Sequence, residues 1–352
     1  MKTITVNTST TYDIYIERGI LKNCGKIIAD TIKTRKIAVI TDDIVDSLYG
    51  KTVIDSLEEN GFETVKFIFP NGEASKCSDT LNKIYTFLCE NNVTRTDCIA
   101  ALGGGVVGDI TGFAAATFLR GLDYIQIPTT LLAQIDSSVG GKTAIDLPCG
   151  KNLVGAFKQP ACVICDPDVL ATLKRETMSD GMAEAIKYGM IRDKNLFDLI
   201  AANNLDSIFD VMDEVICKSI SIKRDVVEND EFDTGERMIL NFGHTLGHAI
   251  ESYYHYEKYT HGSAVAAGMC MITEKSCDSI MTKALKKCVT AYELPVKTDA
   301  PVSELVKLCG NDKKRESGSI NFILCEEIGK AVIKKVSVKE FEKFVVNEVV
   351  NI

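Results

Sequence analysis

Two features are scarce in this 352-residue sequence, long apolar runs and histidine, and its 40 lysines and arginines are outnumbered by 49 acidic residues. No apolar run approaches the ~20 residues that span a bilayer, which excludes a membrane-spanning helix. The formal net charge of -9 argues against nucleic acid as a partner, although it allows a local basic pocket for an anion. The first residues alternate between polar and apolar types and lack the apolar core of a signal peptide.

Disulfide bonds are also not expected, although cysteine is frequent. The thirteen cysteines are an odd number and are scattered along the chain, which favours a reducing cytoplasm. Cys162 and Cys165 form a single CxxC pair within an apolar strand pattern, which we interpret as core packing. Apolar residues make up 45% and charged residues 25%, as is typical of a globular protein, and the length suggests two domains.

The spacing of apolar residues divides the chain into two parts. In the first part, short β-rich runs alternate with helical patterns, which predicts an α/β domain with a parallel sheet over residues 1–174. After an initial hairpin, its strands are expected at 36–41, 63–69, 98–102, 124–130 and 161–166. The second part, 175–352, carries helical spacing except for a short hairpin formed by INFIL and KAVIKKV. A catalytic cleft is expected between the two domains.

All four histidines fall within one window, NFGHTLGHAIESYYHYEKYTH, which spans residues 241–261. His244 and His248 are four residues apart and would share one face of a helix. His261 precedes a new apolar periodic run and is expected at a helix start. Because imidazole is the commonest metal ligand and divalent metals need three or more ligands, the window predicts a metal site that includes the helical pair. The alternative is a set of ordinary histidines on a tyrosine-rich helix.

Gly103, Gly105 and Gly108 satisfy the pattern GxGxxG directly after an expected strand and before a helical pattern. In that context a glycine-rich turn exposes backbone N–H groups to a pyrophosphate, which predicts nucleotide binding. The following strand ends in threonines and not in the usual acidic residue. Asp42, at the end of an earlier strand, is therefore the candidate for a ribose contact. A tight strand-to-helix turn without a ligand is the alternative.

Several charged residues occur where an anion or a metal could bind. Lys142, Lys151 and Asn152 lie in a glycine-rich loop, GGKTAIDLPCGKNLVGAF, although the spacing of a Walker phosphate loop is absent. Glu184 and Lys187 are three apart on one helical face, either as an ordinary ion pair or with Glu184 as an oxygen ligand beside the histidines. The further cations are Lys223, Arg237 and the segment DKKRE at 312–316. Together these cations would suffice to hold a phosphate and a carboxylate.

Four long motifs give the sequence a family resemblance: IPTTLLAQIDSSVGGKTAID, GKNLVGAF, DGMAEAIKYGMI and LNFGHTLGHAIE. They resemble the 3-dehydroquinate synthase family, and the match extends from the strand ending at Asp42 to the DKK near residue 312. The resemblance implies a fold shared with polyol dehydrogenases of the glycerol dehydrogenase type, in which a Rossmann-like domain precedes a helical domain. It also implies a homodimer that acts on a small sugar phosphate. The composition predicts a cytoplasmic protein with no nucleic acid or membrane as a partner.

The resemblance implies a metal set that differs from the helical pair. Zinc or cobalt would be held by Glu184, His244 and His261, whereas His248 would face the substrate and share in proton transfer. NAD would contact Asp42, Gly72, Glu73, Lys76, Gly104, Gly105, Val106, Asp109, Thr129, Thr130, Lys142, Lys151 and Thr172. The substrate, 3-deoxy-D-arabino-heptulosonate 7-phosphate, would contact Asp136, Lys142, Asn152, Lys187, Lys223, Arg237, Asn241 and either Lys313 or Lys314. Arg120 would reach the substrate phosphate from a neighbouring subunit.

The sequence departs from the family pattern at two positions. Asp233 stands where the family commonly has a glutamate that is a candidate proton acceptor, and its side chain is one methylene shorter. The family often has the sequence HGE at its last metal-binding histidine. This chain has His261-Gly262-Ser263, so Ser263 takes the place of the glutamate. This second change is expected to weaken a contact to the metal ligand.

The implied reaction eliminates phosphate from a substrate whose adjacent C–H is not acidic in the ground state. Oxidation of the neighbouring carbinol by NAD gives a ketone that acidifies this C–H, and NADH returns the hydride after phosphate has left. Zinc would lower the pKa of the reacting hydroxyl, and the substrate phosphate itself can accept the proton. The released enol would then close by an aldol step to 3-dehydroquinate, so the cofactor is not consumed.

Three other functions remain as alternatives to this reaction. One is a related sugar-phosphate cyclase with a different substrate, and another is a metal- and NAD-dependent polyol dehydrogenase. The joint presence of Lys142, Lys187, Lys223 and Arg237 favours a phosphorylated substrate over a simple polyol. The third is a non-catalytic nucleotide-binding regulator, against which the Glu/His/His set argues.

Overall fold

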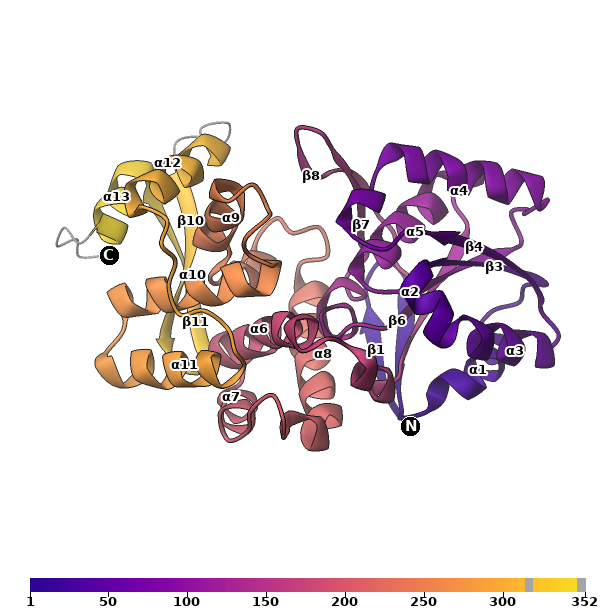
Figure 1. The fold of residues 1–352 in the computed structure, drawn as a ribbon, viewed down its shortest axis with the longest axis horizontal. Helices are drawn as coiled ribbons and strands as arrows, with labels where there is room; N and C mark the ends of the chain where they lie inside the picture. The colour runs from indigo at the N-terminus through magenta and orange to yellow at the C-terminus, as the bar shows by residue number, and fades with distance from the viewer. Residues whose placement is uncertain (314–318, 347–352) are drawn as a thin grey trace. The chain divides into compact units, whose positions relative to one another are not determined.

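The structure is a computed structural model that describes residues 1–313 and 319–346, and it divides the chain into two compact units. Unit 1 comprises Met1–Leu173 and Lys223–Phe232, and unit 2 comprises Lys174–Ile222 and Asp233–Ile352. Figure 1 follows the chain through both units.

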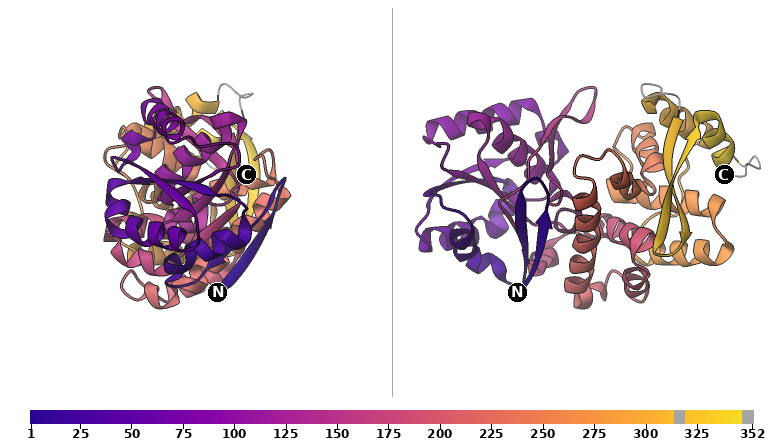
Figure 2. Two further views of the ribbon diagram at one scale, coloured as in Figure 1. Left: turned by 90° about the vertical axis from the view of Figure 1, so that its right-hand side faces the viewer. Right: turned by 180° about the vertical axis from the view of Figure 1, so that it is seen from behind.

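Unit 1 is built on a seven-stranded sheet with the strand order β1-β2-β9-β6-β5-β3-β4. Its strands are β1 (Lys2–Asn7), β2 (Thr11–Ile16), β3 (Lys36–Asp42), β4 (Glu63–Phe69), β5 (Cys98–Gly103), β6 (Asp123–Pro128) and β9 (Cys162–Cys165). β1 and β2 form an antiparallel hairpin, which Figure 2 shows as an indigo ribbon near the N-terminus, and the other pairings in this sheet are parallel. The expected hairpin and parallel α/β sheet are confirmed.

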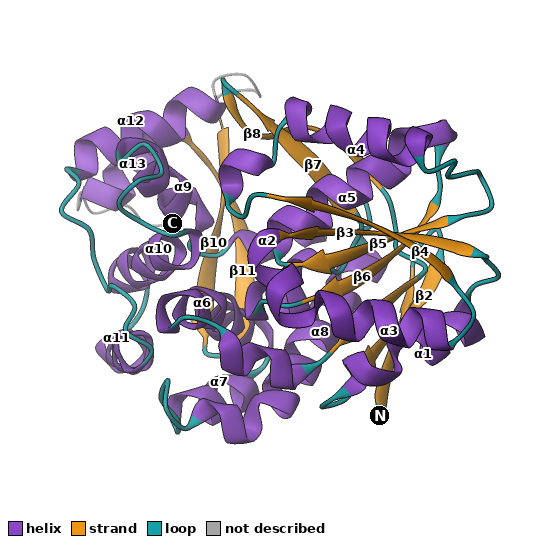
Figure 3. Cartoon of the chain, turned by 45° about the vertical axis from the view of Figure 1, so that its right-hand side comes forward, coloured by secondary structure: helices purple, strands orange, loops and turns teal. Residues whose placement is uncertain are grey.

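Helices cover both faces of this sheet, with α4 and α5 on one face and α1 and α3 on the other (Figure 3). The helices are α1 (Cys24–Thr31), α2 (Asp43–Val45), α3 (Lys51–Glu59), α4 (Ser78–Glu90) and α5 (Gly105–Thr117). Because successive strand residues point to opposite faces, Ala38 and Ile40 of β3 pack with Ile84 of α4 and Ile110 of α5. Ile37, one residue before Ala38, is fully buried on the opposite face.

The parallel strands bring their carboxyl ends to one edge of the sheet. β3 leads outward to β4, whereas β5 leads to β6 on its other side, so the chain order reverses between β3 and β5. In open α/β sheets, ligands bind outside the carboxyl ends of the strands at such a switch point. Asp42 ends β3 and Gly104 follows β5, so both candidate residues lie at this edge.

One segment of unit 1 differs from expectation. The glycine-rich loop containing Lys142 and Lys151 is an antiparallel hairpin of β7 (Lys142–Leu147) and β8 (Gly150–Phe157). A Cβ at Gly155 would lie 2.2 Å from the backbone oxygen of Thr143, so glycine is needed for the two strands to approach. The interpretation of residues 142–157 as a loop was wrong, because Gly155 serves close strand packing and not a turn.

Unit 2 is mostly helical, as expected. Its helices are α6 (Arg175–Arg192), α7 (Lys194–Ala201), α8 (Met212–Asn229), α9 (His244–Tyr253), α10 (His261–Ser276), α11 (Ser279–Ala291), α12 (Val302–Lys313) and α13 (Val338–Val346). The expected late hairpin is β10 (Ser319–Glu327) paired with β11 (Lys330–Ser337). α10 packs against both α6 and α9, and its residues from Ala264 to Cys270 are fully buried. This packing brings together three helices that carry candidate metal ligands.

The sequence predicted a single domain boundary at residue 174. The two units of the structure differ from this prediction in one segment. Lys223–Phe232, which includes the last seven residues of α8, groups with unit 1. Glu228 accepts a hydrogen bond of 2.6 Å from the backbone N–H of Asn7, and Phe232 stacks edge-on with Phe157 at 5.3 Å. Side-chain contacts to Asn7, at the end of β1, and to β8 therefore hold this segment to the first unit. The strand and helix patterns of the sequence do not indicate these contacts.

The described residues bear on two expectations from composition, which concern membrane-spanning helices and disulfide bonds. None of the helices in 1–313 and 319–346 is long and apolar enough to cross a membrane. The thirteen cysteines, all within these ranges, are free thiols. Cys162 and Cys165 are fully buried in β9, which confirms their interpretation as core residues.

Candidate functional site

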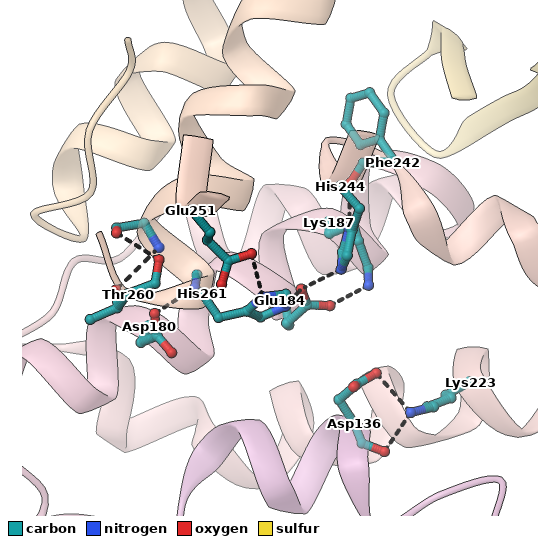
Figure 4. Close-up of polar contacts among 12 residues, drawn as sticks. Asp136, Asp180, Glu184, Lys187, Lys223, Phe242, His244, Glu251, Thr260 and His261 are labelled. Atoms are coloured by element: carbon teal, nitrogen blue, oxygen red, sulfur yellow. Dashed lines mark hydrogen bonds and ion pairs between the residues drawn. The ribbon is translucent and has the colours of Figure 1, made fainter. Parts of the chain in front are cut away.

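The candidate metal ligands of unit 2 come together around the carboxylate of Glu184 (Figure 4). Glu184 lies near the middle of α6, whose residues from Gly181 to Ile191 are buried on every side. A helix that is buried all round places its polar side chains in the protein interior. The Glu184 side chain is only 1% exposed.

Two imidazoles face one oxygen of this carboxylate. The Nε2 atoms of His244 and His261 lie 3.4 Å and 3.6 Å from Oε1 of Glu184. His244 is the first residue of α9, after Gly243 with a φ of 80°. His261 is the first residue of α10, as expected, where Thr260 caps the helix by accepting from the backbone N–H of Ser263.

Glycines allow the two histidine-bearing helices to approach each other. A Cβ at Gly268 of α10 would lie 2.2 Å from the backbone oxygen of Gly243, and one at Gly247 would lie 3.2 Å from backbone atoms of Val265. Glycine is needed at Gly268 for the backbones to pass this closely. The close approach brings His244 and His261 to a ring-centroid distance of 5.2 Å.

The second ring nitrogen of each histidine also has a polar neighbour. Nδ1 of His244 lies 3.1 Å from the backbone oxygen of Phe242, and Nδ1 of His261 lies 3.6 Å from Oε2 of Glu251. When Nδ1 carries the proton toward an acceptor, Nε2 keeps its lone pair for a metal. Both rings are therefore oriented so that Nε2 points toward Glu184.

The electrostatics of the cluster are those of a site for a cation. Burial and the Lys187 ammonium hold the pKa of His244 well below its usual value, so this ring is neutral. Burial lowers the pKa of His261, but the carboxylates of Glu184 and Glu251 outweigh it and raise the pKa to about 10. Burial would raise the pKa of Glu184, yet Lys187 and the two histidines hold it well below its usual value. A metal ion would replace the proton of His261.

The residues present fit a divalent metal. Oε2 of Glu184 pairs with the buried Lys187 ammonium, whereas Oε1 is a buried oxygen without a hydrogen-bond partner among the described residues. One ligand atom each from Glu184, His244 and His261 lies within 4.8 Å of the others. One carboxylate oxygen and two imidazole nitrogens are a common donor set for catalytic zinc, which keeps a further position open.

His248 belongs to a different set. It shares a face of α9 with His244, and the two rings are 5.4 Å apart, but its side chain is exposed and it groups with Glu251 and His261 instead. The other candidates of unit 2 lie nearby in the sequence: Arg237 is buried in η8 (Glu236–Asn241), Asn241 ends that turn, and Asp233 precedes it with a φ of 58°. Lys313 ends α12, and Lys314 lies outside the described residues.

In unit 1, the candidate nucleotide residues gather at the carboxyl edge of the sheet. Oδ1 of Asp42 accepts a hydrogen bond of 2.9 Å from the N–H of Val45 and caps α2. Gly104 precedes α5, and a Cβ there would lie 3.0 Å from Thr130. The remaining candidates at this edge are Gly72 and Glu73 after β4, Gly105, Val106 and Asp109 on α5, Thr129 after β6, and Thr172 at the end of η6 (Pro167–Thr172).

An ion network lies beside this edge. Nζ of Lys76, whose side chain is only 5% exposed, donates to Oδ2 of Asp109 and to Oδ1 of Asn152, at 2.5 Å each. Burial raises the pKa of Asp109 to about 6, although Lys76 opposes this. Lys151 lies 3.7 Å from Glu73. The helix α5, the turn after β4 and the β7–β8 hairpin are thus joined by charge-assisted contacts.

A second pair in unit 1 joins Asp136 and Lys223. Nζ of Lys223 donates to the backbone oxygen and to Oδ1 of Asp136, at 2.5 Å and 2.8 Å. Asp136 lies on the π-helix η5 (Ala133–Ser137), and Lys223 is 5% exposed. Lys142 is exposed at the start of β7, and Arg120 is exposed in η4 (Phe118–Arg120) with a φ of 69°.

Two polar residues beside His261 were not predicted from the sequence. Glu251 lies seven residues after His244, and this spacing of two helical turns could have indicated it. Asp180 lies on α6, and its Oδ1 accepts a hydrogen bond of 2.5 Å from the N–H of Gly262. Its sequence position gives no signal, because the contact joins helices 82 residues apart.

The comparisons with known proteins agree with this architecture. A parallel-sheet unit followed by a helical unit is the class of fold also found in a solved probable glycerol dehydrogenase from Sinorhizobium meliloti, with a TM-score of 0.63, 14% identity and coverage of 95% of both chains. A solved 2-epi-5-epi-valiolone synthase from Streptomyces hygroscopicus, with NAD+ and Zn2+ bound, has a TM-score of 0.86, 23% identity and coverage of 97% of this chain and 98% of that chain.

Sequence comparison identifies the family within this class. The family models for the 3-dehydroquinate synthase N-terminal and C-terminal parts match residues 66–180 and 181–315. A 3-dehydroquinate synthase of Clostridium acetobutylicum is 48% identical over 352 aligned residues, which cover 98% of this chain and 99% of that protein. The chain belongs to the 3-dehydroquinate synthase family.

Proposed function

We propose that this chain converts 3-deoxy-D-arabino-heptulosonate 7-phosphate to 3-dehydroquinate and phosphate, a step of the shikimate pathway to aromatic amino acids. The observation that carries the proposal is the set of buried Glu184 with the half-buried His244 and His261, in a chain 48% identical to a 3-dehydroquinate synthase. The thirteen free thiols favour a reducing cytoplasm as its location.

The residues of unit 2 would hold the metal and the reacting part of the substrate. Glu184, His244 and His261 would bind zinc or cobalt, and His248, whose ring is exposed, would exchange a proton with the substrate. Lys187 is paired with Glu184 and would also place an ammonium beside the substrate. Arg237, Asn241, Asp233 and one of Lys313 and Lys314 complete the proposed substrate contacts of this unit.

The residues of unit 1 would hold the dinucleotide and the departing phosphate. Asp42 would accept hydrogen bonds from a ribose, and the N-terminus of α5 at Gly104 and Gly105 would receive the pyrophosphate. The other proposed NAD contacts are Gly72, Glu73, Lys76, Val106, Asp109, Thr129, Thr130, Lys142, Lys151 and Thr172. The proposed substrate contacts of this unit are Asp136, Lys142, Asn152 and Lys223. Lys142 and Lys223 would stabilise the charge of phosphate as it leaves.

The bound groups supply chemistry that side chains lack: a Lewis acid that stabilises an alkoxide, and a reversible hydride acceptor. The chain positions the carbinol, neutralises the phosphate with lysine side chains and moves a proton through His248. Since the substrate phosphate can accept the proton from carbon, the elimination needs no separate protein base.

Phosphate release tests the proposal directly. The pure protein, NAD, zinc and the heptulosonate phosphate should release phosphate only when NAD is present, while absorbance at the NADH wavelength stays flat at steady state. A flat trace is expected because the hydride removed in the first step returns in a later one. Stoichiometric accumulation of NADH would contradict the proposal and favour a polyol dehydrogenase.

A related cyclase reaction is the second candidate, because the fold also matches a 2-epi-5-epi-valiolone synthase with a TM-score of 0.86. Offering the protein other sugar phosphates under the same conditions separates the two candidates. We expect the seven-carbon heptulosonate phosphate to be turned over with by far the highest kcat/KM. Faster phosphate release from another ketose phosphate would favour the second candidate.

We also propose that the active form is a homodimer in which Arg120 contacts the substrate phosphate of the partner subunit. The support is its exposure at the end of η4, where Leu119 and Arg120 both have positive φ values, of 49° and 69°. Guanidinium–phosphate contacts are strong, so Arg120→Ala should raise KM. Neither nucleic acid nor a membrane has a part in this proposal.

Mixing two inactive variants tests the shared site. Arg120→Ala and Lys187→Ala homodimers should each be nearly inactive, whereas heterodimers contain one site that keeps both residues. With random exchange, about a quarter of the wild-type activity should return. If the mixture stays inactive although mass spectrometry detects heterodimers, Arg120 does not act across subunits.

A further inference from the structure

The carboxylate of Glu251 lies beside the metal set without belonging to it. Its Oε2 is 3.6 Å from Nδ1 of His261, and the side chain is only 6% exposed (Figure 4). A buried carboxylate is costly unless it has a charged or hydrogen-bonding partner. One partner that it faces is the ring nitrogen of His261 on the side away from Glu184.

The geometry separates Glu251 from the ligands. One imidazole can present Nε2 to an ion at Glu184 and Nδ1 to Glu251, but a single ion cannot be bound through both nitrogens of the ring. A second set of His248, Glu251 and His261 also lies within 4.8 Å, but there His248 is exposed. The set around Glu184 has a fully buried oxygen aimed at two Nε2 atoms, which favours metal binding there.

We propose that Glu251 is a positioning residue for the metal site: its carboxylate accepts the Nδ1–H of His261 and holds Nε2 toward Glu184, without binding the ion. The inference rests on the proposed metal set. Carboxylate–histidine pairs of this kind fix the tautomer and the ring orientation of a ligand and increase its basicity.

Two other polar residues near His261, Asp180 and Ser263, contact the backbone and not the ring. Asp180 accepts from the N–H of Gly262, and a Cβ on Gly262 would lie 2.1 Å from the backbone oxygen of Asp180. The hydroxyl of Ser263 donates to the backbone oxygen of Thr260 at 2.9 Å, within the first turn of α10. Glu251 therefore supplies the ring contact that Ser263 does not.

Metal affinity of the full-length apoprotein tests the proposal. Zn2+ is titrated in competition with a chromophoric chelator into the wild type, Glu251→Ala, Glu251→Gln and a control, Glu274→Ala. Glu274 is a matched control because it is a carboxylate on α10 that pairs with Lys286, at 3.0 Å, and not with a histidine. Glu251→Ala should bind Zn2+ about 10- to 100-fold more weakly. Glu251→Gln, which keeps an acceptor oxygen, should fall between it and the wild type, and Glu274→Ala should match the wild type.

The visible absorption of bound Co2+ provides a readout that a purely structural role would not change. The ligand-field bands should shift in Glu251→Ala and return toward those of the wild type in Glu251→Gln, because ring orientation changes the coordination geometry. If Glu251→Ala does not fold, as judged by near-UV circular dichroism, the isosteric Glu251→Gln alone must bind more weakly than Glu274→Ala.

Two results would overturn the inference. Zn2+ affinities of both Glu251 variants within about twofold of Glu274→Ala would make Glu251 a packing residue only. Complete loss of Zn2+ from Glu251→Ala and His248→Ala, with retention in His244→Ala, would make Glu251 a ligand. Because metal alone is titrated, failure here is distinguishable from failure of the proposed reaction, which is read from phosphate release by the wild type.

Discussion

The charged cluster of unit 1 and that of unit 2 differ in how their charges are balanced. In unit 1, the ammonium of Lys76 is neutralised by Asp109 and also donates to Asn152, so the network closes on itself. In unit 2, Glu184 pairs with Lys187 through one oxygen, while its other oxygen faces two imidazole nitrogens and has no hydrogen-bond partner among the described residues. The first cluster is complete as it stands, whereas the second is completed by a cation.

This difference matters because buried charge is costly unless it is compensated. A closed network stabilises the positions of the groups that a ligand will meet. A buried carboxylate oxygen without a hydrogen-bond partner attracts a positive ion strongly, because the low dielectric of the interior strengthens the interaction. The first arrangement therefore suits a preformed binding surface, and the second suits a resident metal.

Removal of the central carboxylate should have the largest effect. Glu184→Ala takes away a ligand and leaves the Lys187 ammonium buried without its partner. We expect loss of bound metal by elemental analysis, no detectable phosphate release, and a decrease of about 3–5 kcal/mol in the free energy of unfolding in urea. The double variant Glu184→Met/Lys187→Met should also lose the metal, but with a smaller loss of stability, because no buried charge remains. Retention of metal by Glu184→Ala would contradict the proposed set.

The next effect separates His248 from the metal ligands. His248→Ala should keep stoichiometric metal and lose about 10²- to 10⁴-fold in kcat, the usual contribution of a proton-transfer group. His244→Ala and His261→Ala should instead be isolated without metal. A metal-free His248→Ala would mean that the helical pair His244 and His248 binds the ion.

The pH dependence of stability tests the closed network of unit 1. Burial raises the pKa of Asp109 from 3.8 to about 6, so the folded chain holds this proton more tightly than the unfolded chain. The stability it contributes is fully present below pH 3.8 and is lost as the pH rises through about 6. The difference between these two pKa values corresponds to roughly 3 kcal/mol in the free energy of unfolding. Urea unfolding of the apoprotein from pH 4 to 7 should therefore show a steeper decline in the wild type than in Asp109→Asn.

An exposed aspartate provides the control for this comparison. Asp79 lies in the first turn of α4 and is exposed, so Asp79→Asn shows the effect of removing a carboxylate that is not buried. Parallel curves for the wild type and Asp109→Asn between pH 4 and 6 would contradict the assignment of this proton to Asp109.

The smallest effect concerns the first turn of α10. Thr260→Ala removes the helix cap next to His261 and should cost about 1 kcal/mol of unfolding free energy. Ser263→Ala should leave Zn2+ affinity within about twofold of the wild type, because its hydroxyl donates to Thr260 and not to the ring. A marked loss of affinity in Ser263→Ala would assign Ser263 a contact with the ligand that its hydrogen bond does not indicate.

Local patterns were sufficient to predict most of the fold. Period-two and helical spacing located the parallel strands, the two hairpins at the ends of the chain and the start of α10 at His261, because these patterns reflect burial of one face of each element. The β7–β8 hairpin was not predicted, because the glycine-rich segment that contains Gly155 was interpreted as a loop. Its actual role, close approach to the backbone of Thr143, depends on a partner strand.

The sequence alone determined the family, and the resemblance of its long motifs implied Glu184, His244 and His261 as the metal set. Residue spacing by itself did not determine which groups meet, and the tertiary structure shows why. His244 and His248 satisfy helical spacing, yet Glu184 and His261, 60 residues before and 17 residues after His244, are the groups that face it. The physical reason is that spacing along one helix fixes a shared face, whereas a metal site needs donors from several directions. Here, packing of α6, α9 and α10 provides those directions.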